Sequence, residues 1–224
     1  LEVPIRGKKR NAIVVDVKPV SSTKTALKAA TFSLRKLPQQ PDPVVLPRTL
    51  RSTAEDLARI YPASTGAILF QLIPTDIKNG VRHYPRIDEV QQQEETIPQV
   101  LTAKIEERFD IYQSLIRSTF AKKGSLLLVV QTPPDVQHAV SVLQKGIAER
   151  IIVFSTNQTK KQRDESYQRM NDTTGAKLII TTPNYAYLER ADLQAIIVEQ
   201  SASGMYQMRQ RPYLDHRTAL MSYA

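Results

Sequence analysis

Short apolar runs alternate with amphipathic segments through the second half of the chain, from residue 101 to residue 224. The apolar runs predict strands at 126–130, 151–154, 178–180 and 195–198. The segments between them predict helices at about 104–121, 133–145 and 160–170. Such alternation is typical of a parallel sheet with helices on both faces, so the fold class is α/β. We expect the last two strands to be central, because β-branched runs suit burial on both faces.

Residues 1–36 have a strand-like pattern interrupted by basic residues. The pattern predicts a hairpin over residues 1–20, in which Gly7 permits a tight turn and residues 12–17 form the return strand. A further strand is predicted over residues 25–36. Four prolines between residues 38 and 47 then favour an extended connection.

Two short helices are predicted before Pro74. Ser52-Thr53-Ala54-Glu55 has the form of a capping box that opens a helix ending at Ile60. Ser64 or Thr65 is the candidate cap of a second helix, over residues 66–72. Residues 1–74 are therefore expected to form a small β-rich α+β module.

Residues 75–100 are polar and slightly acidic, with Gln91-Gln92-Gln93-Glu94-Glu95 at their centre. This composition predicts a linker. The expected organisation is thus a module at 1–74, a linker at 75–100 and an α/β lobe at 101–224. The chain opens at Leu1 inside a strand-like pattern, and we interpret it as a fragment or partial reading frame.

Composition excludes several classes of protein. Hydrophobic residues make up 41% and charged residues 24% of the chain, as in ordinary globular proteins. No apolar run approaches the roughly 20 residues of a membrane helix, and no signal peptide is visible, so we expect no membrane contact and a cytoplasmic location. The absence of cysteine excludes disulfides, and three widely spaced histidines predict no zinc site.

Positive charge is concentrated at the start of the chain. The net charge is +9, and residues 1–74 hold 12 Lys and Arg against 5 Asp and Glu. Four cations crowd the predicted hairpin turn, formed by Arg6, Gly7, Lys8, Lys9 and Arg10. Like charges so close repel one another, which favours contact with phosphates of a nucleic acid. The alternative is a solubilising turn.

Two groups of segments carry a resemblance to a known family. The first comprises Val3-Pro4-Ile5, the Gly7 turn, Ile13-Val14-Val15, Ala58-Arg59-Ile60-Tyr61 and Gly66-Ala67-Ile68-Leu69. The second comprises Asp110-Ile111-Tyr112, Leu128-Val129-Val130-Gln131, Phe154-Ser155, Gln162-Arg163, Tyr206-Gln207, Tyr213 and Arg217. In order and spacing the chain resembles the primosomal protein N-prime (PriA) family of bacterial replication-restart helicases. The resemblance implies a 3′-DNA-end-binding domain followed by the first RecA-like lobe.

The resemblance also implies where DNA would bind. In that family the first domain holds the 3′ terminus of a nascent strand at a stalled fork, and Gly7 and Lys28 match positions lining the terminal-nucleotide pocket. The family's pocket aspartate would lie on a strand upstream of Leu1. Residues 75–100 are too few for the family's winged-helix domain, and the second RecA-like lobe has no counterpart here.

The phosphate-binding loop of such helicases is missing. It requires two glycines five residues apart, and no pair of the seven glycines has this spacing. Counted back from Asp110, the loop falls on residues 102–109, where Arg108 replaces the lysine and Phe109 the magnesium-binding hydroxyl. The alternative, which we prefer, is that residues 102–120 form one long amphipathic helix.

The catalytic acids are also altered. Helicases of superfamily 2 carry Asp-Glu-x-His where this chain has Glu199-Gln200-Ser201-Ala202. The amide of Gln200 cannot take a proton from water, although Glu199 retains an acid. With Arg108, Glu199 and Gln200 as degenerate positions, the sequence predicts no catalysis and no ATP or magnesium cofactor.

The sequence thus predicts a non-catalytic PriA-like DNA-binding protein of replication restart, which binds single-stranded or forked DNA near a 3′ end. Two alternatives remain open: a protein-interaction scaffold for the primosome, which would bind replication-restart proteins, or a fragment of an active ATP-dependent helicase. Secondary DNA contacts are expected from Lys160, Lys161, Arg163, Arg209 and Arg211. For Tyr206 and Tyr213, base stacking and core packing are the two interpretations.

Overall fold

The structure, a computed structural model, describes residues 2–5, 8–12, 19–31, 46–79, 84 and 97–224. The chain forms two compact units. One comprises Leu1–Val45 with Thr75–His83, and the other Leu46–Pro74 with Tyr84–Ala224. This division departs from the predicted boundary at residue 74, because residues 46–74 belong with the α/β lobe and not with the N-terminal hairpin.

The first unit contains the predicted hairpin, with a different return strand. Strand β1 (Glu2–Ile5) pairs antiparallel with β2 (Lys8–Asn11), so the return strand comes earlier than residues 12–17. Residues 13–17 lie outside the described part. The predicted turn at Arg6 and Gly7 also lies outside the described part.

The strand predicted over residues 25–36 is wrong for the residues that the structure describes. Helix α1 spans Val20–Ala29 and begins after Pro19, whose carbonyl accepts a bond from the Ser22 hydroxyl at 2.7 Å. Alanine, leucine and lysine, which dominate its second half, are strong helix formers. Residues 32–36 lie outside the described part, and a one-turn helix, α4 (Thr75–Lys78), also belongs to this unit.

The second unit is built on a four-stranded parallel sheet, which confirms the predicted α/β fold. Its strands are β3 (Ser125–Val129), β4 (Ile151–Phe154), β5 (Leu178–Thr181) and β6 (Leu193–Val198), in the order β4-β5-β3-β6. All four predicted strands are thus present. One expectation is wrong: β6 is an edge strand and half-buried, whereas β3 and β5 are central and fully buried.

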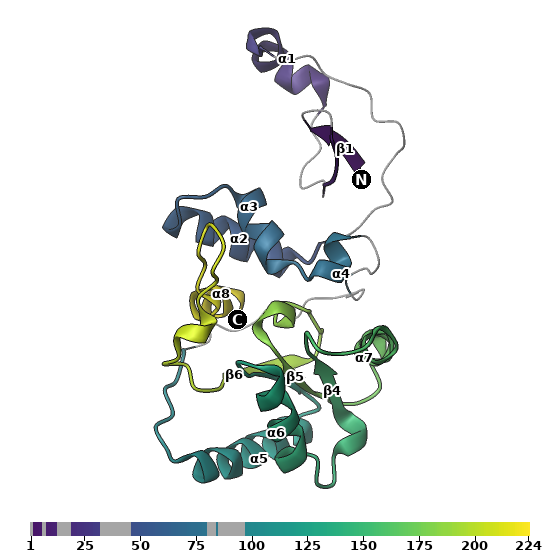
Figure 1. The fold of residues 1–224 in the computed structure, drawn as a ribbon, viewed down its shortest axis with the longest axis vertical. Coiled ribbons are helices and arrows are strands. Elements are labelled where there is room, and N and C mark those ends of the chain that lie inside the picture. The colour runs from purple at the N-terminus through teal and green to yellow at the C-terminus, as the bar shows by residue number, and fades with distance from the viewer. Residues whose placement is uncertain (1, 6–7, 13–18, 32–45, 80–83, 85–96) are drawn as a thin grey trace. The chain divides into compact units, whose positions relative to one another are not determined.

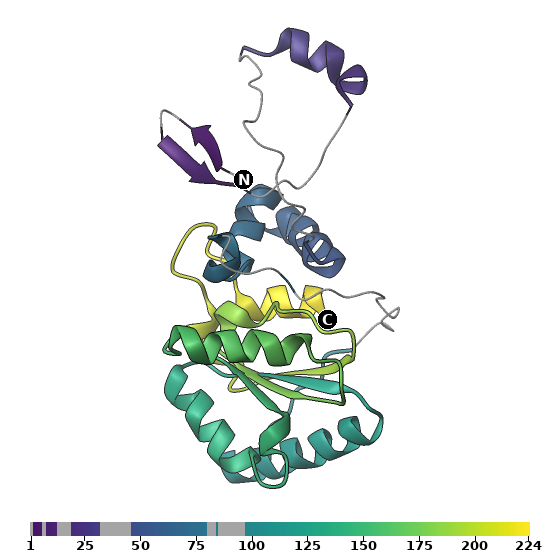
Figure 2. The same cartoon turned by 90° about the vertical axis from the view of Figure 1, so that its right-hand side faces the viewer.

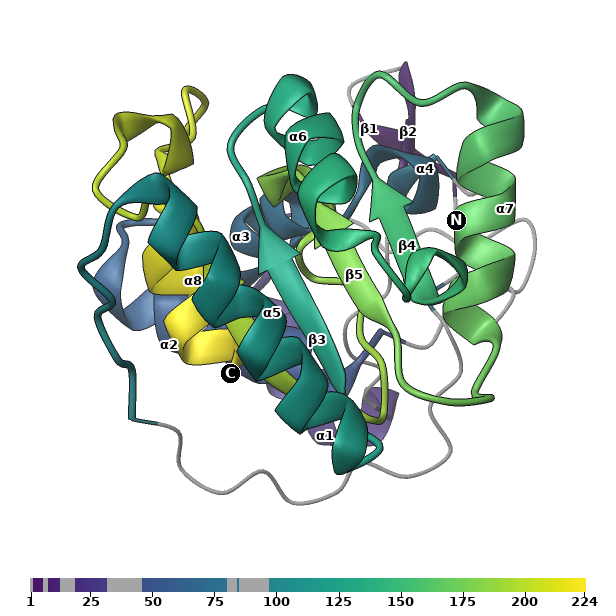
Figure 3. The same ribbon diagram turned by 90° about the horizontal axis from the view of Figure 1, so that it is seen from below.

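Helices cover both faces of this sheet (Figures 1, 2 and 3). On one face lie α5 (Ile105–Ala121) and α6 (Pro133–Leu143). On the other lie α7 (Lys160–Asn171) and α8 (His216–Tyr223). The first three confirm the predicted helices. Three short 3-10 turns complete the lobe, at Ala148–Arg150, Pro183–Tyr185 and Gly204–Tyr206.

The core beneath α5 and α6 follows from helical spacing. Phe109, Tyr112, Ile116 and Thr119 recur every three or four residues along α5 and are all buried. They and the buried residues of α6 pack on inward-facing residues of the strands, such as Leu126 and Ile180 in the same cluster.

Helix α2 (Arg48–Ile60) packs on α8 of the lobe, and α3 (Thr65–Leu72) packs on α2. The Thr53 hydroxyl lies 3.3 Å from the Ser222 carbonyl, and the Tyr61 hydroxyl accepts from the Asp215 amide at 3.2 Å. The predicted capping box is wrong, because α2 begins at Arg48 and Ser52 lies inside it. The predicted Ser64 cap is confirmed, since its hydroxyl accepts from the Ala67 amide.

Candidate functional site

The candidate site lies at the carboxyl ends of β3 and β6, the edge where open α/β sheets bind ligands. Strand β3 leads into Val130-Gln131 and β6 into Glu199-Gln200, so these residues meet at one edge because the strands are parallel neighbours. The first turns of α5 lie beside them.

Glu199 is held by two side chains of α5. The Arg108 guanidinium donates to one carboxylate oxygen of Glu199 from Nη2 at 2.8 Å and from Nε at 3.2 Å. The Tyr112 hydroxyl donates to the other oxygen. The Arg108 Nη1 also donates to the Ala103 carbonyl at 3.0 Å, which fixes the guanidinium. Both oxygens of the buried carboxylate are therefore engaged by donors of the protein itself.

The surroundings of Arg108 and Tyr112 favour the protonated form of both side chains. The hydrogen bond to Glu199 raises the pKa of Arg108 above its ordinary value. Burial, followed by the hydrogen bond to Glu199, raises the pKa of Tyr112. The guanidinium thus stays charged and the phenol stays protonated, so both act as permanent donors to Glu199.

Gln200 belongs to a network of neutral amides. The Gln131 Nε2 donates to the Gln200 side-chain oxygen at 2.9 Å, and the Ser203 hydroxyl donates to the Gln131 side-chain oxygen at 3.0 Å. The backbone of Gln200 has φ of 49°, an uncommon left-handed conformation that turns the chain sharply after β6. No group of this network can accept a proton at neutral pH.

The cavity at this edge measures about 30 Å³, room for one or two water molecules. Its lining is formed by Ile105, Phe109, Val130, Gln131, Asp135, His138, Glu199 and Gln200. Helix α5 takes up residues 105–109 of the stretch 102–109, where the resemblance places the phosphate loop. In the described part of the chain, no cluster of three or more His, Asp or Glu is placed to bind a metal ion.

The structure brings the three degenerate positions together in the second unit, and the described DNA-contact candidates belong to the first unit. Arg108 and Glu199 are in direct contact, and Gln200 follows at once. Lys8 and Lys28 are exposed in the first unit, and Lys28 lies on a helix. Lys9 and Arg10 lie on β2. Arg6 and Gly7 lie outside the described residues.

Among the secondary candidates, the lysines lie at the same edge of the sheet. Lys160 and Lys161 are exposed at the first turn of α7, which follows β4. Figure 3 shows the start of α7 at the edge toward which the arrows of β3, β4 and β5 point. Arg163 is half-buried and donates to the Gln158 carbonyl at 2.9 Å.

The other secondary candidates lie in or after the 3-10 turn at Gly204–Tyr206. Arg209, Arg211 and Tyr213 are exposed, whereas Tyr206 is fully buried with its hydroxyl 2.6 Å from the Glu199 carbonyl. For Tyr206 the core-packing interpretation is therefore correct.

Three acidic groups near the carboxyl ends of the strands have partners within the lobe. Glu199 pairs with Arg108, and Asp215 pairs with Arg217, whose hydrogen bond lowers the pKa of Asp215. The Asp135 carboxylate accepts from the Thr132 amide at 3.0 Å and closes the cap of α6. These three carboxylates therefore have partners within the lobe, while Lys160 and Lys161 of α7 face solvent.

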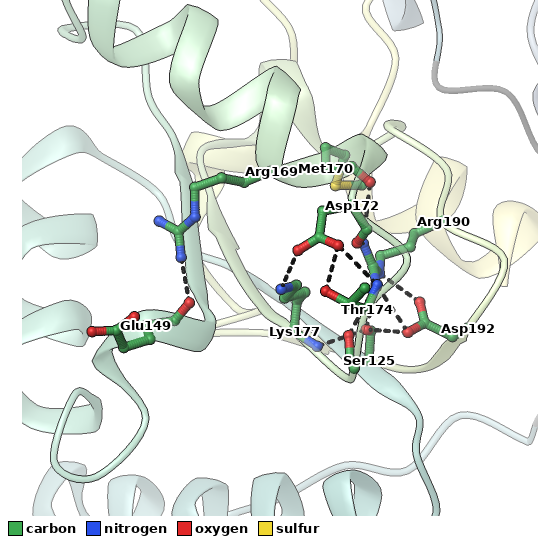
Figure 4. Close-up of polar contacts among 10 residues, drawn as sticks. Ser125, Glu149, Arg169, Met170, Asp172, Thr174, Lys177, Arg190 and Asp192 are labelled. Atoms are coloured by element: carbon green, nitrogen blue, oxygen red, sulfur yellow. Dashed lines mark hydrogen bonds and ion pairs between the residues drawn. The ribbon is translucent and has the colours of Figure 1, made fainter.

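A second polar cluster, which the sequence did not reveal, lies at the opposite edge of the sheet (Figure 4). Arg190 is 7% exposed and donates to the Ser125 hydroxyl, to three carbonyls and to Asp192. Beside it, Lys177 binds Asp172 at 2.8 Å. Since the guanidinium of Arg190 donates only to groups of the fold itself, this cluster stabilises the lobe. The available signal was an arginine close to the apolar run 185–188.

Comparison with known proteins adds no identification: no family model matches the chain, and no curated protein is significantly similar to it. In the described part of the chain, each helix is too short or too polar to cross a bilayer.

Proposed function

We propose that this protein binds DNA without hydrolysing a nucleotide, as a PriA-like factor that recognises single-stranded or forked DNA near a 3′ end. The absence of hydrolysis in this proposal is supported by the hydrogen bonds of Arg108 and Tyr112 to Glu199, which we call the clamp on Glu199. Magnesium would have to compete with these three donor bonds for the carboxylate of Glu199, and the neighbouring amide of Gln200 cannot act as a base.

Charge supports the DNA-binding part. The chain carries a net +9, and exposed cations occur in both units. In the first unit they include Lys8 and Lys28. At the carboxyl edge of the sheet they include Lys160 and Lys161, in the first turn of α7. Contacts of this kind act on phosphates and give affinity that falls with salt and depends little on base sequence.

The experiment is a fluorescence anisotropy titration of the chain with a labelled fork at several salt concentrations. We expect a fork with a free 3′ hydroxyl to bind more tightly than the same fork with a 3′ phosphate. Equal affinity for the two forks would refute the proposed recognition of the 3′ end. Affinity that does not change with salt would refute the proposed contacts to phosphates.

Variants separate the two cationic regions. Lys160→Gln with Lys161→Gln should lower the salt slope by about 1.4, if each lysine neutralises one phosphate of a single strand. Lys8→Gln with Lys28→Gln should reduce the preference for the free 3′ end. The matched control is Lys122→Gln with Lys145→Gln, since both residues are exposed where α5 and α6 end, at the opposite edge of the sheet. If the control weakens binding as much as the other pairs, only net charge matters and no defined surface exists.

A further inference from the structure

Strand β6 has an open edge. It is the last strand in the order β4-β5-β3-β6, so β3 pairs with only one of its sides. The Glu199 amide donates to the Val129 carbonyl at 2.9 Å, which shows that odd-numbered residues direct their backbone groups toward β3. In a parallel ladder the pattern repeats every second residue, so Ile196 and Val198 direct their N–H and C=O groups outward. Within the described part of the chain, no hydrogen bond reaches these groups.

Helix α5 overhangs this edge. Its first turns reach Glu199 at the end of β6, and Gly124, just beyond its last turn, lies so close to Gln194 that an added Cβ would stand 2.2 Å from that side chain. The helix therefore runs antiparallel to β6. Gln113, on one flank of α5, approaches the Val142 carbonyl of α6 at 3.5 Å, so that flank faces α6.

The opposite flank of α5 bears an apolar stripe. Ile111 and Leu115, four residues apart, are 41% and 37% exposed. They lie on the flank of Arg108, which reaches toward the end of β6. Together with the half-buried residues 195–198 they form an apolar surface beside unpaired backbone groups. Natural edge strands usually carry lysine or proline as protection, and β6 has neither.

The charged residues at the two ends of α5 indicate what kind of molecule binds this surface. Lys104 and Lys122 lie directly before and after α5, in helical register with Ile111 and Leu115, and both are exposed. A second copy of the chain fits poorly, because two-fold pairing of β6 with itself would bring Lys104 of one copy beside Lys122 of the other. Two chains of net charge +9 also repel each other.

We infer that the β6 edge binds an extended segment of a partner protein that has an apolar centre and an acidic residue at each end. The segment adds a strand to β6, places alternate apolar side chains under Ile111 and Leu115, and pairs its acids with Lys104 and Lys122. The 17 residues of α5 span about 25 Å, which an extended segment of about seven residues matches. This inference is independent of the proposed DNA binding.

The test is a titration of the full chain with a fluorescent peptide, Glu-Val-Thr-Val-Thr-Val-Glu, which reads the same in both directions. The comparison peptide carries lysine in place of both glutamates. We expect the glutamate peptide to bind at least tenfold more tightly, and Lys104→Glu with Lys122→Glu to invert the preference. Equal affinity for the two peptides, or no measurable binding of either, would overturn the inference.

Two variants locate the binding surface. Ile196→Pro removes an outward N–H while leaving the hydrogen bonds to β3 in place, and edge strands tolerate such a substitution. It should weaken binding of the glutamate peptide about tenfold. Ile111→Ser with Leu115→Ser should weaken it about fivefold or more. The control Ile60→Ser removes an apolar side chain that is 65% exposed on α2 and should change nothing. Binding that survives both edge variants, or a dimer in light scattering that Ile196→Pro dissociates, would refute a partner segment at this edge.

Discussion

Removing the Arg108 side chain is the sharpest test of the clamp on Glu199. The two side chains are only 19% and 8% exposed, and a carboxylate left there without its cation is poorly solvated. Two unit charges about 4 Å apart at an effective dielectric constant of about 20 attract each other by roughly 4 kcal/mol. Measured losses for one partner of a buried pair are about 3–5 kcal/mol. Because Tyr112 still donates to Glu199, we expect Arg108→Ala to cost about 3 kcal/mol of unfolding free energy.

Thermal and urea unfolding measure this loss. For a chain of 224 residues, a loss of about 3 kcal/mol corresponds to a fall in Tm of roughly 6–12 °C. Arg117→Ala is the matched control, because Arg117 lies on the same helix but is exposed and should contribute under about 0.5 kcal/mol.

The second substitution identifies the cause. In Arg108→Ala with Glu199→Gln, the buried group is neutral, so most of the lost stability should return. If Arg108→Ala proves no more destabilising than Arg117→Ala, or if Glu199→Gln restores nothing, the ion pair does not hold this corner of the lobe as described.

Three further predictions concern other described groups. Arg190→Met should cost at least about 3 kcal/mol of unfolding free energy, because it leaves buried acceptors without a hydrogen-bond donor. Arg190→Lys should recover less than half of this loss, because lysine has fewer donors. Equal stability of the two variants would contradict the role of the cluster. Burial lowers the pKa of His216 to about 4 from 6.5, so the unfolded chain binds the extra proton between these values and stability should fall by about 3 kcal/mol from pH 6.5 to pH 4. Urea unfolding at both pH values should show a smaller fall for His216→Gln, and an identical fall would show that other groups titrate. Gln200→Glu restores an acid next to Glu199 but should yield no ATPase activity, because the clamp on Glu199 remains; phosphate release above that of the parent chain would contradict this.

The sequence predicted the α/β lobe well because its signals are local. Apolar runs and helical periodicity lie within single segments, and the structure confirms strands β3 to β6 and helices α5 to α7. The edge position of β6 was missed, since an apolar run looks the same in a central strand and in an edge strand whose exposed flank a helix overhangs. Residues 25–29 were misassigned as a strand because basic residues at both ends were read as strand flanks, while the Ala-Leu-Lys-Ala run favours a helix.

The candidate site was only partly predictable. Arg108, Glu199 and Gln200 were identified as degenerate positions, but the contact between the first two joins residues 91 positions apart, and no local pattern encodes it. Tyr112 was quoted only as part of a matching segment, although its spacing of four from Arg108 places both on one side of α5. The Arg190 cluster depends on carbonyls supplied by a distant turn, which sequence alone does not place.

The most direct test of the account measures phosphate release from MgATP while the chain is bound to forked DNA, with binding followed by anisotropy in the same sample. The account predicts a saturated DNA complex with phosphate release no faster than that of the Glu199→Ala variant. Turnover that rises with DNA and disappears in Glu199→Ala would contradict it.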